Sequence, residues 1–343
     1  MSVALVLREK GRFRLEEREL RETRPDEALL SIIATGICGS DIHGAAGHTG
    51  RRSVGQVMGH ETVGRVMAVG SSDNDPLLGV TVAVDPVVSC GSCSPCMSGL
   101  HQHCATGWVV GVRPDVDGAF ASHIVVPVRN LAPLPPGMTD WHGALVEPLA
   151  VGYHAIRRGR TEPSDRVLVL GGGPIGQGLA LACRRVGIEA LVVSEPDSGR
   201  ATFIERELGF HTSRPDNLDE AVHETLGGPA TLVFDAVGNE SSMADALSHS
   251  APHARVVLVG MDAPRLSISA YEISSRERTI IGTICSTREH FRETAEWAGQ
   301  NASIISRLAD LHAPLREAPE VFAKLMAGTL RANKMLLFPE EHK

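Results

Sequence analysis

Hydrophobic and polar residues alternate along much of the first 145 residues of the chain. From Arg12 to Glu19, apolar and charged side chains follow one another in the pattern of a strand with one face on a core. Three further β-branched runs, each ended by Gly, Asp or Pro, cover residues 28–38, 62–69 and 80–84. This half of the chain is therefore predicted to be rich in β-structure.

The pattern changes at Arg166. Short apolar runs now alternate with stretches whose apolar residues recur every three or four positions. Such alternation is typical of βαβ units, in which a helix connects two parallel strands. The predicted strands are Val167–Leu170, Leu191–Ser194, Leu232–Asp235, Val256–Val259 and Ile280–Ile284.

The last part of the chain returns to longer helical patterns. Two amphipathic helices are predicted around Arg288–Gly299 and Glu317–Ala327, followed by a strand at Lys334–Phe338 whose partner the local sequence does not identify. The Pro- and Gly-rich segment Leu131–Met138 is expected to be a surface connection. A hinge between the two halves is therefore predicted within residues 145–165.

Three glycines directly follow the first predicted parallel strand. Gly171, Gly173 and Gly176 have the spacing G-x-G-x-x-G, and Pro174 and Ile175 open the helix that comes next. In this context the first glycine permits a tight turn, the second lets the backbone approach a pyrophosphate, and the third allows close packing of helix on strand. The motif therefore predicts a dinucleotide site.

The next predicted strand ends at Glu195, nineteen residues after Gly176. An acidic residue there can accept hydrogen bonds from the ribose hydroxyls and would repel a 2′-phosphate, which favours NAD over NADP. Arg200 complicates this choice, because it could lie against adenosine or bind a 2′-phosphate. Val237 and Val259, each at the end of a predicted strand, are further cofactor candidates, with ordinary strand-to-helix turns as the alternative.

The composition narrows the classes of protein that the chain can represent. Its 343 residues are 43% hydrophobic and 22% charged, a globular composition with length for two domains. A formal net charge of −8 and only 4% aromatic residues argue against a nucleic-acid-binding protein. Neither a signal peptide nor a membrane span is recognisable, so a reducing, cytoplasmic location without membrane attachment is expected.

Four of the seven cysteines crowd into one short segment, at Cys90, Cys93, Cys96 and Cys104. Clustered thiols in a reducing compartment are more often metal ligands than disulfides. Four thiolates with no open position predict a closed, tetrahedral structural zinc site. An iron–sulfur cluster is the alternative, since the first three cysteines have ferredoxin-like spacing, but the fourth spacing and the lack of a following Cys-Pro favour zinc.

A second set of possible ligands is scattered over three segments. It comprises Cys38, the pair His60-Glu61, and Glu147. Each residue alone is more often an ordinary core or polar residue than a ligand, and the two remaining cysteines, Cys183 and Cys285, are expected in the core. Together, a thiolate, an imidazole and carboxylates outside the dinucleotide half predict a catalytic zinc with one position open for water or substrate.

In their order and distances, these motifs resemble those of the zinc-dependent medium-chain dehydrogenase/reductase superfamily, to which the alcohol dehydrogenases belong. The matching motifs are Cys38-Gly-Ser-Asp-Ile-His43, Gly59-His60-Glu61, the four-cysteine segment, Glu147-Pro148-Leu149 and Gly171–Gly176. Glu61 and Glu147-Pro148 resemble the polyol (sorbitol-type) and threonine dehydrogenase branches. Ser40 and the segment 117–127 favour the polyol and sugar-acid side, whereas Gly44 and His123 depart from relatives that often have an aromatic residue and Tyr there.

The resemblance implies an α/β protein in which a GroES-like, β-rich catalytic domain is interrupted by a Rossmann domain with a doubly wound parallel sheet. The expected domains are residues 1–150 with 286–343, and residues 151–285. Two zinc ions per chain and NAD are implied, the catalytic zinc being bound by Cys38, His60 and either Glu61 or Glu147, which exchange during turnover in some relatives. A homodimer or homotetramer is also implied, paired edge to edge through the predicted strands at 280–284 and 256–259.

The same resemblance suggests roles for neighbouring polar residues. Ser40 and His43 are candidates for a relay that carries the alcohol proton away, with helix capping as the alternative. Glu61 is retained as a catalytic residue as well as a ligand. Asp41 is expected to pair with a cation or to orient a ligand. Lys334 is expected to be solvated, with contact to the cofactor pyrophosphate as the alternative.

The leading hypothesis is therefore a zinc-dependent oxidoreductase. It would transfer a hydride between the carbinol carbon of a secondary alcohol, in a polyol, sugar acid or related compound, and NAD. One alternative is a threonine-type dehydrogenase of an amino-acid alcohol. Another is a non-catalytic zinc- or nucleotide-binding relative, although such a protein would be expected to lose its metal ligands and all candidates are present here.

Overall fold

The computed structural model describes residues 1–48 and 50–339 of the chain. The chain divides into two compact units, one formed by Met1–Glu147 with the segment from Thr287 onward, the other by Pro148–Ser286. The first boundary lies near the start of helix α3 (Val146–Arg158). Along the described residues, no helix combines the length and apolar character needed to span a membrane.

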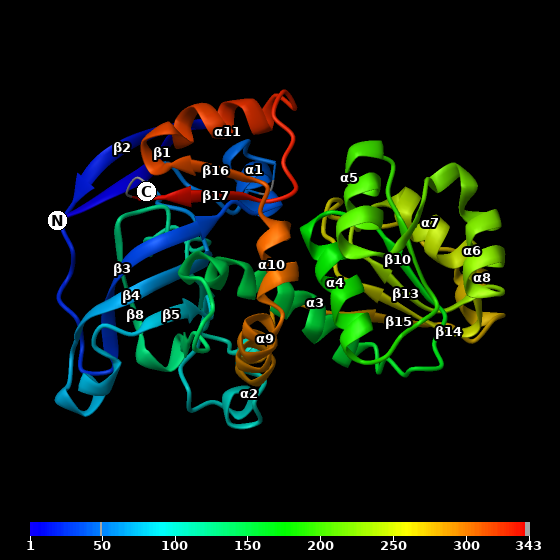
Figure 1. Cartoon of the computed structure of the whole chain (residues 1–343), viewed down its shortest axis with the longest axis horizontal. Coiled ribbons are helices and arrows are strands. Elements are labelled where there is room, and N and C mark those ends of the chain that lie inside the picture. The colour runs from blue at the N-terminus through cyan, green and yellow to red at the C-terminus, as the bar shows by residue number, and fades with distance from the viewer. Residues whose placement is uncertain (49, 340–343) are drawn as a thin grey trace. The chain divides into compact units, whose positions relative to one another are not determined.

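The first unit contains a seven-stranded sheet in which segments from both ends of the chain are neighbours (Figure 1). The strands run in the order β16, β17, β3, β4, β5 and β9, and β8 also pairs with β3. Their bounds are β3 (Glu27–Gly36), β4 (Glu61–Val69), β5 (Thr81–Val84), β8 (His123–Pro127), β9 (Leu131–Pro133), β16 (Leu311–Pro314) and β17 (Met335–Phe338). The predicted final strand thus finds its partner in β3.

Two further pairs of strands complete the β-structure of this unit. The chain begins with an antiparallel hairpin of β1 (Ser2–Glu9) and β2 (Arg12–Arg18), and β6 (Val87–Val88) pairs with β7 (Trp108–Val109). The sequence pattern predicted β2 but not β1. Strand β3 also ends earlier than expected, at Gly36, so that Cys38 lies beyond the strand and directly before helix α1 (Gly39–Ala45).

The C-terminal helices pack on the same core. Helix α11 (Ala318–Met326) buries Val321 and Phe322, and the Phe322 ring lies 4.4 Å from that of Phe13 and 5.5 Å from that of Phe120, measured between centroids. Burial of such aromatic rings is a large apolar contribution to stability. Helices α2 (Ser94–Met97), α9 (Arg288–Gln300) and α10 (Ala302–Leu308) belong to the same unit.

The second unit is a six-stranded parallel sheet in the order β12, β11, β10, β13, β14, β15. The strands are β10 (Val167–Leu170), β11 (Leu191–Ser194), β12 (His211–Ser213), β13 (Ala230–Asp235), β14 (Ser250–Leu258) and β15 (Thr279–Gly282). Helices α4 (Pro174–Arg185) and α5 (Ser198–Phe203) lie on one side of it, and α6 (Leu218–Leu226), α7 (Glu240–Ser248) and α8 (Ala270–Ser274) on the other (Figure 1). The predicted fold class is confirmed.

Two expectations about this unit are wrong. Residues 256–259 cannot form part of an exposed edge, because β14 is hydrogen-bonded to β13 on one side and β15 on the other. Only β15 lies at that edge of the sheet. Of the two cysteines expected in the core, Cys183 is fully buried but Cys285 is only half-buried, since it lies in the loop after β15.

Candidate active site and metal sites

Cys38, His60 and Glu61 come together in the first unit. One possible ligand atom from each lies within 4.8 Å of the others. Cys38 precedes α1, and His60 and Glu61 lie at the start of β4, which pairs with β3 so that Glu61 is opposite Gly36. The antiparallel register of β3 and β4 therefore brings the end of one strand, and the loop after it, to the beginning of the other.

These three residues fit a zinc ion. Sulfur, imidazole nitrogen and carboxylate oxygen are the donors that zinc takes in proteins. His60 and Glu61 are buried, and His60 Nδ1 has no hydrogen-bond partner among the described residues. Burial and the nearby Glu61 carboxylate raise the pKa of the Cys38 thiol to about 11, and a bound cation would favour the thiolate instead. A buried imidazole without a hydrogen-bond partner, beside a thiol and a carboxylate, is costly unless a further group such as a metal compensates it.

Glu147 lies outside this three-residue group. It is the second residue of α3 and is half-buried. The pKa of its carboxyl is raised to about 8, mainly by burial. The nearby His60 lowers this pKa, whereas Glu61 and Cys38 raise it. Glu147 therefore belongs to the electrostatic surroundings of the cluster, while Glu61 is the carboxylate closest to the thiol and the imidazole.

Lys334 lies in the same place, which corrects the expectation of a solvated lysine. Its side chain is only 3% exposed and its Nζ forms an ion pair with Glu61 Oε2. Burial lowers the pKa of Lys334, but the nearby Glu61 and Cys38 raise it more, so that the net shift is upward. The lysine reaches Glu61 because β17 pairs with β3 at Leu336 and Gly36.

Asp41 lies behind the imidazole. Its Oδ1 is 3.6 Å from His60 Nδ1, and its Oδ2 accepts a hydrogen bond from the backbone N–H of Cys38 at 3.2 Å. Arg52 Nη2 lies 3.4 Å from the same carboxylate, and both side chains are almost completely buried. Asp41 therefore pairs with a cation and also faces a ligand residue, as the sequence suggested. Gly44 provides the space for Arg52, because a Cβ there would lie 2.7 Å from Arg52 Cγ.

The two relay candidates share a face of α1. Ser40 and His43 are three residues apart on this helix, a spacing that places side chains next to one another. Both are exposed. Ser40 also forms a hydrogen bond with the Cys38 thiol. The structure thus places one relay candidate beside the metal-site cluster and the other one helical turn away.

The four cysteines of the second cluster also converge. Their sulfur atoms all lie within 4.8 Å of one another, with 3.4 Å between those of Cys93 and Cys96. Cys90 accepts backbone hydrogen bonds from Ser92 and Cys93, which lower the pKa of its thiol to about 5. The backbone N–H of Cys90 likewise lowers the pKa of the Cys104 thiol, whereas hydrogen bonds with neighbouring thiols help to raise the pKa of Cys93 to about 12. Four sulfurs this close fit a tetrahedral zinc site, in which a bound cation would favour the thiolate of each.

The glycine loop of the second unit has the geometry that the motif predicts. Gly171 follows β10 with φ +91°, a backbone conformation that favours glycine. Gly176 packs so closely that a Cβ would lie 1.8 Å from the Gly171 carbonyl oxygen. Gly173 caps α4, and Pro174 is its first residue. Ile175 is half-buried, so the buried face of α4 begins at Gly176.

Glu195 is bound to this loop. One carboxylate oxygen accepts the Gly172 N–H at 3.0 Å, and the other accepts the Asp197 N–H at 2.8 Å. Arg200 Nη1 donates to the first oxygen at 3.0 Å. The glutamate thus joins the phosphate-loop candidate to the turn after β11. Arg200 is engaged with that carboxylate, which sequence reasoning did not anticipate.

The two remaining cofactor candidates lie at the carboxyl ends of neighbouring strands. Val237 follows β13 and packs against Gly171, where a Cβ would meet its Cγ2 at 2.8 Å. Val259 follows β14, and its backbone N–H donates to the Asp235 carbonyl at 2.9 Å. Both residues are half-buried. The sheet therefore brings them to the edge at which the glycine loop lies.

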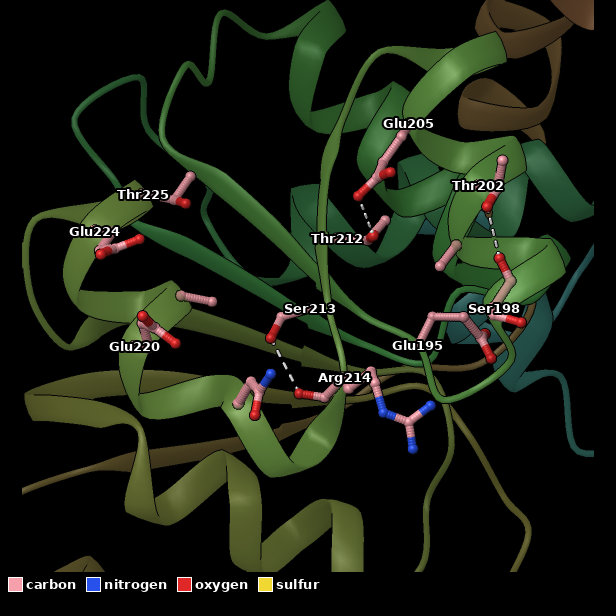
Figure 2. A pocket seen from close by; sticks show the side chains of 13 residues that line it. Glu195, Ser198, Thr202, Glu205, Thr212, Ser213, Arg214, Glu220, Glu224 and Thr225 are labelled. Atoms are coloured by element: carbon pink, nitrogen blue, oxygen red, sulfur yellow. Dashed lines mark hydrogen bonds between the residues drawn. The ribbon is translucent and has the colours of Figure 1, made fainter.

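A polar hollow of about 430 Å³ opens beside Glu195 (Figure 2). Glu220 and Glu224 of α6 lie on one side of it, and Ser198 and Glu205 lie on the side of α5. Its other lining residues are Glu195, Ala201, Thr202, Thr212, Ser213, Arg214, Asn217, Ala221 and Thr225. Most of its charge is negative, which disfavours an additional phosphate group on this side of Glu195.

Sequence reasoning missed two residues of the metal-site cluster. These are Lys334, which is distant in the sequence from its partner Glu61, and Arg52, which lies outside every motif. Nothing in the local pattern marks either residue as buried. The signal that could have identified Lys334 is its place directly before a short apolar strand, which predicts a sheet partner but not which strand.

Comparison with known proteins gives a consistent result. Residues 24–136 match the family described as alcohol dehydrogenase GroES-like domain, and residues 174–300 match zinc-binding dehydrogenase. L-galactonate-5-dehydrogenase of Escherichia coli K12 is 34% identical over 80% of this chain and 81% of that protein. 2-dehydro-3-deoxy-L-galactonate 5-dehydrogenase of Pseudoalteromonas atlantica is 31% identical over 95% of each chain.

Solved structures share the fold along almost the whole chain. An Escherichia coli CFT073 protein described as a short chain alcohol dehydrogenase, complexed with NADH, superposes with a TM-score of 0.89 at 26% identity, covering 98% of this chain and 99% of that one. A putative zinc-binding dehydrogenase from Sinorhizobium meliloti, bound to NADP, superposes with a TM-score of 0.87 at 26% identity over 99% of each chain. Both nicotinamide cofactors thus occur among similar structures.

Proposed function

This chain belongs to the zinc-binding dehydrogenases of the alcohol dehydrogenase superfamily, and from that premise we propose that it oxidises a secondary hydroxyl of a polyol or sugar acid to a ketone. The hydride passes to NAD and the hydroxyl proton to solvent. The observation that carries the proposal is the convergence of Cys38, His60 and Glu61 in one buried cluster. The sugar-acid relatives support the substrate class.

The metal content follows from the two clusters. A zinc ion bound by Cys38, His60 and a glutamate would supply Lewis acidity toward a substrate oxygen. Of the two glutamates, Glu61 is favoured by its position and Glu147 is the alternative. A second zinc bound by Cys90, Cys93, Cys96 and Cys104 would be structural, because four protein ligands leave no open position.

The proton leaves through side chains of α1. Ser40 accepts the proton of the substrate hydroxyl and passes it toward His43, whose exposed ring can exchange it with water. The Asp41 carboxylate, 3.6 Å from His60 Nδ1, places negative charge beside this ligand.

The cofactor is NAD rather than NADP. The glycine loop, Val237 and Val259 line the carboxyl edge of the parallel sheet, where such sheets bind dinucleotides. The Glu195 carboxylate already accepts three hydrogen bonds from the protein, and its remaining lone pairs accept hydrogen bonds from the ribose hydroxyls. A 2′-phosphate would meet this carboxylate and the acidic hollow beside it.

The chain forms at least a dimer. Strand β15 is paired on one side only among the described residues. Three large apolar side chains are exposed in the elements next to it along the chain: Met261 after β14, Tyr271 in α8 and Ile284 after β15. We expect two copies to align their β15 strands, and a proline in place of Ile281 to reduce the mass in solution to that of one chain. An unchanged mass for Ile281→Pro would exclude this edge.

One experiment separates the main alternatives. The purified protein is analysed for zinc and then assayed with NAD or NADP against L-galactonate, sorbitol and L-threonine, following reduced nicotinamide by absorbance. We expect about two zinc ions per chain and turnover of the sugar acid or the polyol. Turnover of threonine alone would favour the amino-acid alcohol, and one zinc per chain without any turnover would favour a non-catalytic relative.

A further inference from the structure

We propose that Lys334 is a positioning residue of the zinc site that weakens the binding of Glu61 to the metal and so keeps that glutamate exchangeable with Glu147. The inference rests on the proposed function. It concerns a residue that no motif identifies, and it explains why two glutamates lie near one thiol and one imidazole.

The first observation is the contact itself. Lys334 Nζ forms an ion pair with Glu61 Oε2, and the two side chains are 3% and 1% exposed. Water therefore screens neither charge, and the attraction between them is much stronger than at a surface. A carboxylate oxygen that accepts from an ammonium group has less electron density to donate to a metal ion, so the affinity of Glu61 for zinc falls.

The second observation is that the backbone fixes the lysine in this place. The Lys334 N–H donates to Asp310 Oδ1 at 2.9 Å, and the Lys334 carbonyl accepts from the Leu311 N–H at 3.4 Å. The next residues enter β17, which pairs with β3 at Leu336 and Gly36. The side chain is therefore anchored on the sheet that carries Glu61.

The third observation concerns Gly36, whose lack of a side chain leaves the space in which Lys334 and Glu61 meet. A Cβ at Gly36 would lie 2.2 Å from Glu61 Oε2 and 3.0 Å from Lys334 Cε. The first distance is too short for a real contact and the second is unusually tight, so a larger residue at this position would displace the Glu61 carboxylate from the ion pair. The absence of a side chain at Gly36 thus permits the lysine and the glutamate to meet.

The fourth argument is a balance of charge. Zinc with a Cys38 thiolate and one glutamate is neutral, and a second ionised glutamate adds one negative charge. Lys334 supplies the positive charge that compensates it, while Arg52 and Asp41 already compensate each other. A second glutamate can therefore approach the metal without leaving an uncompensated negative charge, as an exchange of ligands requires.

The test measures zinc affinity, with the metal alone as the probe. Full-length wild type and Lys334→Met are titrated against a chelator, and the Cys38→Ser variant of each defines the zinc retained elsewhere. Removing Lys334 eliminates its repulsion of the cation and frees Glu61 as a full ligand. Because the repulsion is lost, we expect the zinc of this site to bind more tightly in Lys334→Met, while kcat falls. The expected factor is about 10–100, the size of effect that residues around the ligands have on metal affinity.

Three controls decide the interpretation. Lys334→Arg retains the positive charge, so its zinc affinity should stay within about threefold of the wild-type value. This change is small compared with the effects that substitutions around metal ligands usually have on affinity. In Glu61→Gln with Lys334→Met, the gain in affinity should disappear. Cobalt substituted for zinc should give weaker visible absorption in Lys334→Met than in wild type, as expected for a higher coordination number.

A lysine that only stabilises the fold gives the opposite result. Its removal would loosen the cluster and weaken zinc binding, and an equal or lower affinity in Lys334→Met overturns the inference. If Lys334→Met does not fold, Lys334→Gln is measured by the same criteria. A wild type that lacks zinc at Cys38 would instead refute the proposed function itself, so the two failures are distinguishable.

Discussion

Glu195 accepts a hydrogen bond from the backbone N–H of Gly172 at 3.0 Å, and this contact joins the glycine loop to the strand end that carries the glutamate. The same carboxylate accepts from the Asp197 N–H and from Arg200. A residue first selected as a ribose acceptor therefore also determines the conformation of the loop that is expected to face the pyrophosphate.

This double role predicts the effect of Glu195→Ala. The substitution leaves buried N–H donors without an acceptor, so we expect a loss of about 1–3 kcal/mol in the free energy of unfolding. NAD should bind more weakly, and the ratio of the affinities for NAD and NADP should decrease. Calorimetric titration with both cofactors measures this, with Glu205→Ala in the same hollow as the control. An unchanged preference would refute the proposed ribose contact.

Cys38→Ser tests the zinc cluster of the first unit. Because serine is a poor zinc ligand, we expect zinc content to fall from about two ions to about one per chain and turnover to be lost. NAD binding should remain close to wild type, since the glycine loop belongs to the other unit. Cys285→Ser, at a half-buried thiol outside both clusters, is the matched control and should retain both zinc ions and activity.

Asp41→Asn separates the effect of the Asp41 carboxylate on His60 from its compensation of the Arg52 charge. Arg52 would then be a buried cation without its anionic partner, and we expect a cost of about 3–5 kcal/mol in unfolding free energy. Zinc affinity should fall about 10–100-fold because His60 loses its neighbouring carboxylate. Adding Arg52→Met should restore much of the stability but not the affinity. Urea unfolding and chelator titration follow the two quantities separately, and joint recovery would contradict the assignment.

His43→Asn tests the proton relay. General acid–base groups contribute about 10²–10⁴-fold, so we expect kcat to fall within that range near neutral pH. The loss should shrink as the pH rises, because hydroxide can then remove the proton directly. His48→Asn is the control, because His48 is also exposed and lies just after α1. The centroids of the His48 and His43 rings are 6.1 Å apart. A similar loss in both variants would argue against a specific relay.

The sequence by itself determined the features that depend on neighbours along the chain. The turn at Gly171, the close packing of Gly176 and the approach of four sulfurs between Cys90 and Cys104 each arise within a few residues. Spacing is sufficient there because a turn or a short loop brings such residues together in most contexts. Fold class and family follow from the same local motifs taken in order, and both are confirmed.

Only the tertiary structure decided what surrounds Glu61. The burial of Lys334 and its pairing with Glu61 depend on β17 adding to β3 at the far end of the chain, and on the absence of a side chain at Gly36 between them. The contact of Glu195 with the Gly172 N–H, across the paired strands β10 and β11, and the position of β15 at the sheet edge are likewise set by strand order. Strand order is a long-range property, because a short apolar strand can pair with many others and only the complete core selects one.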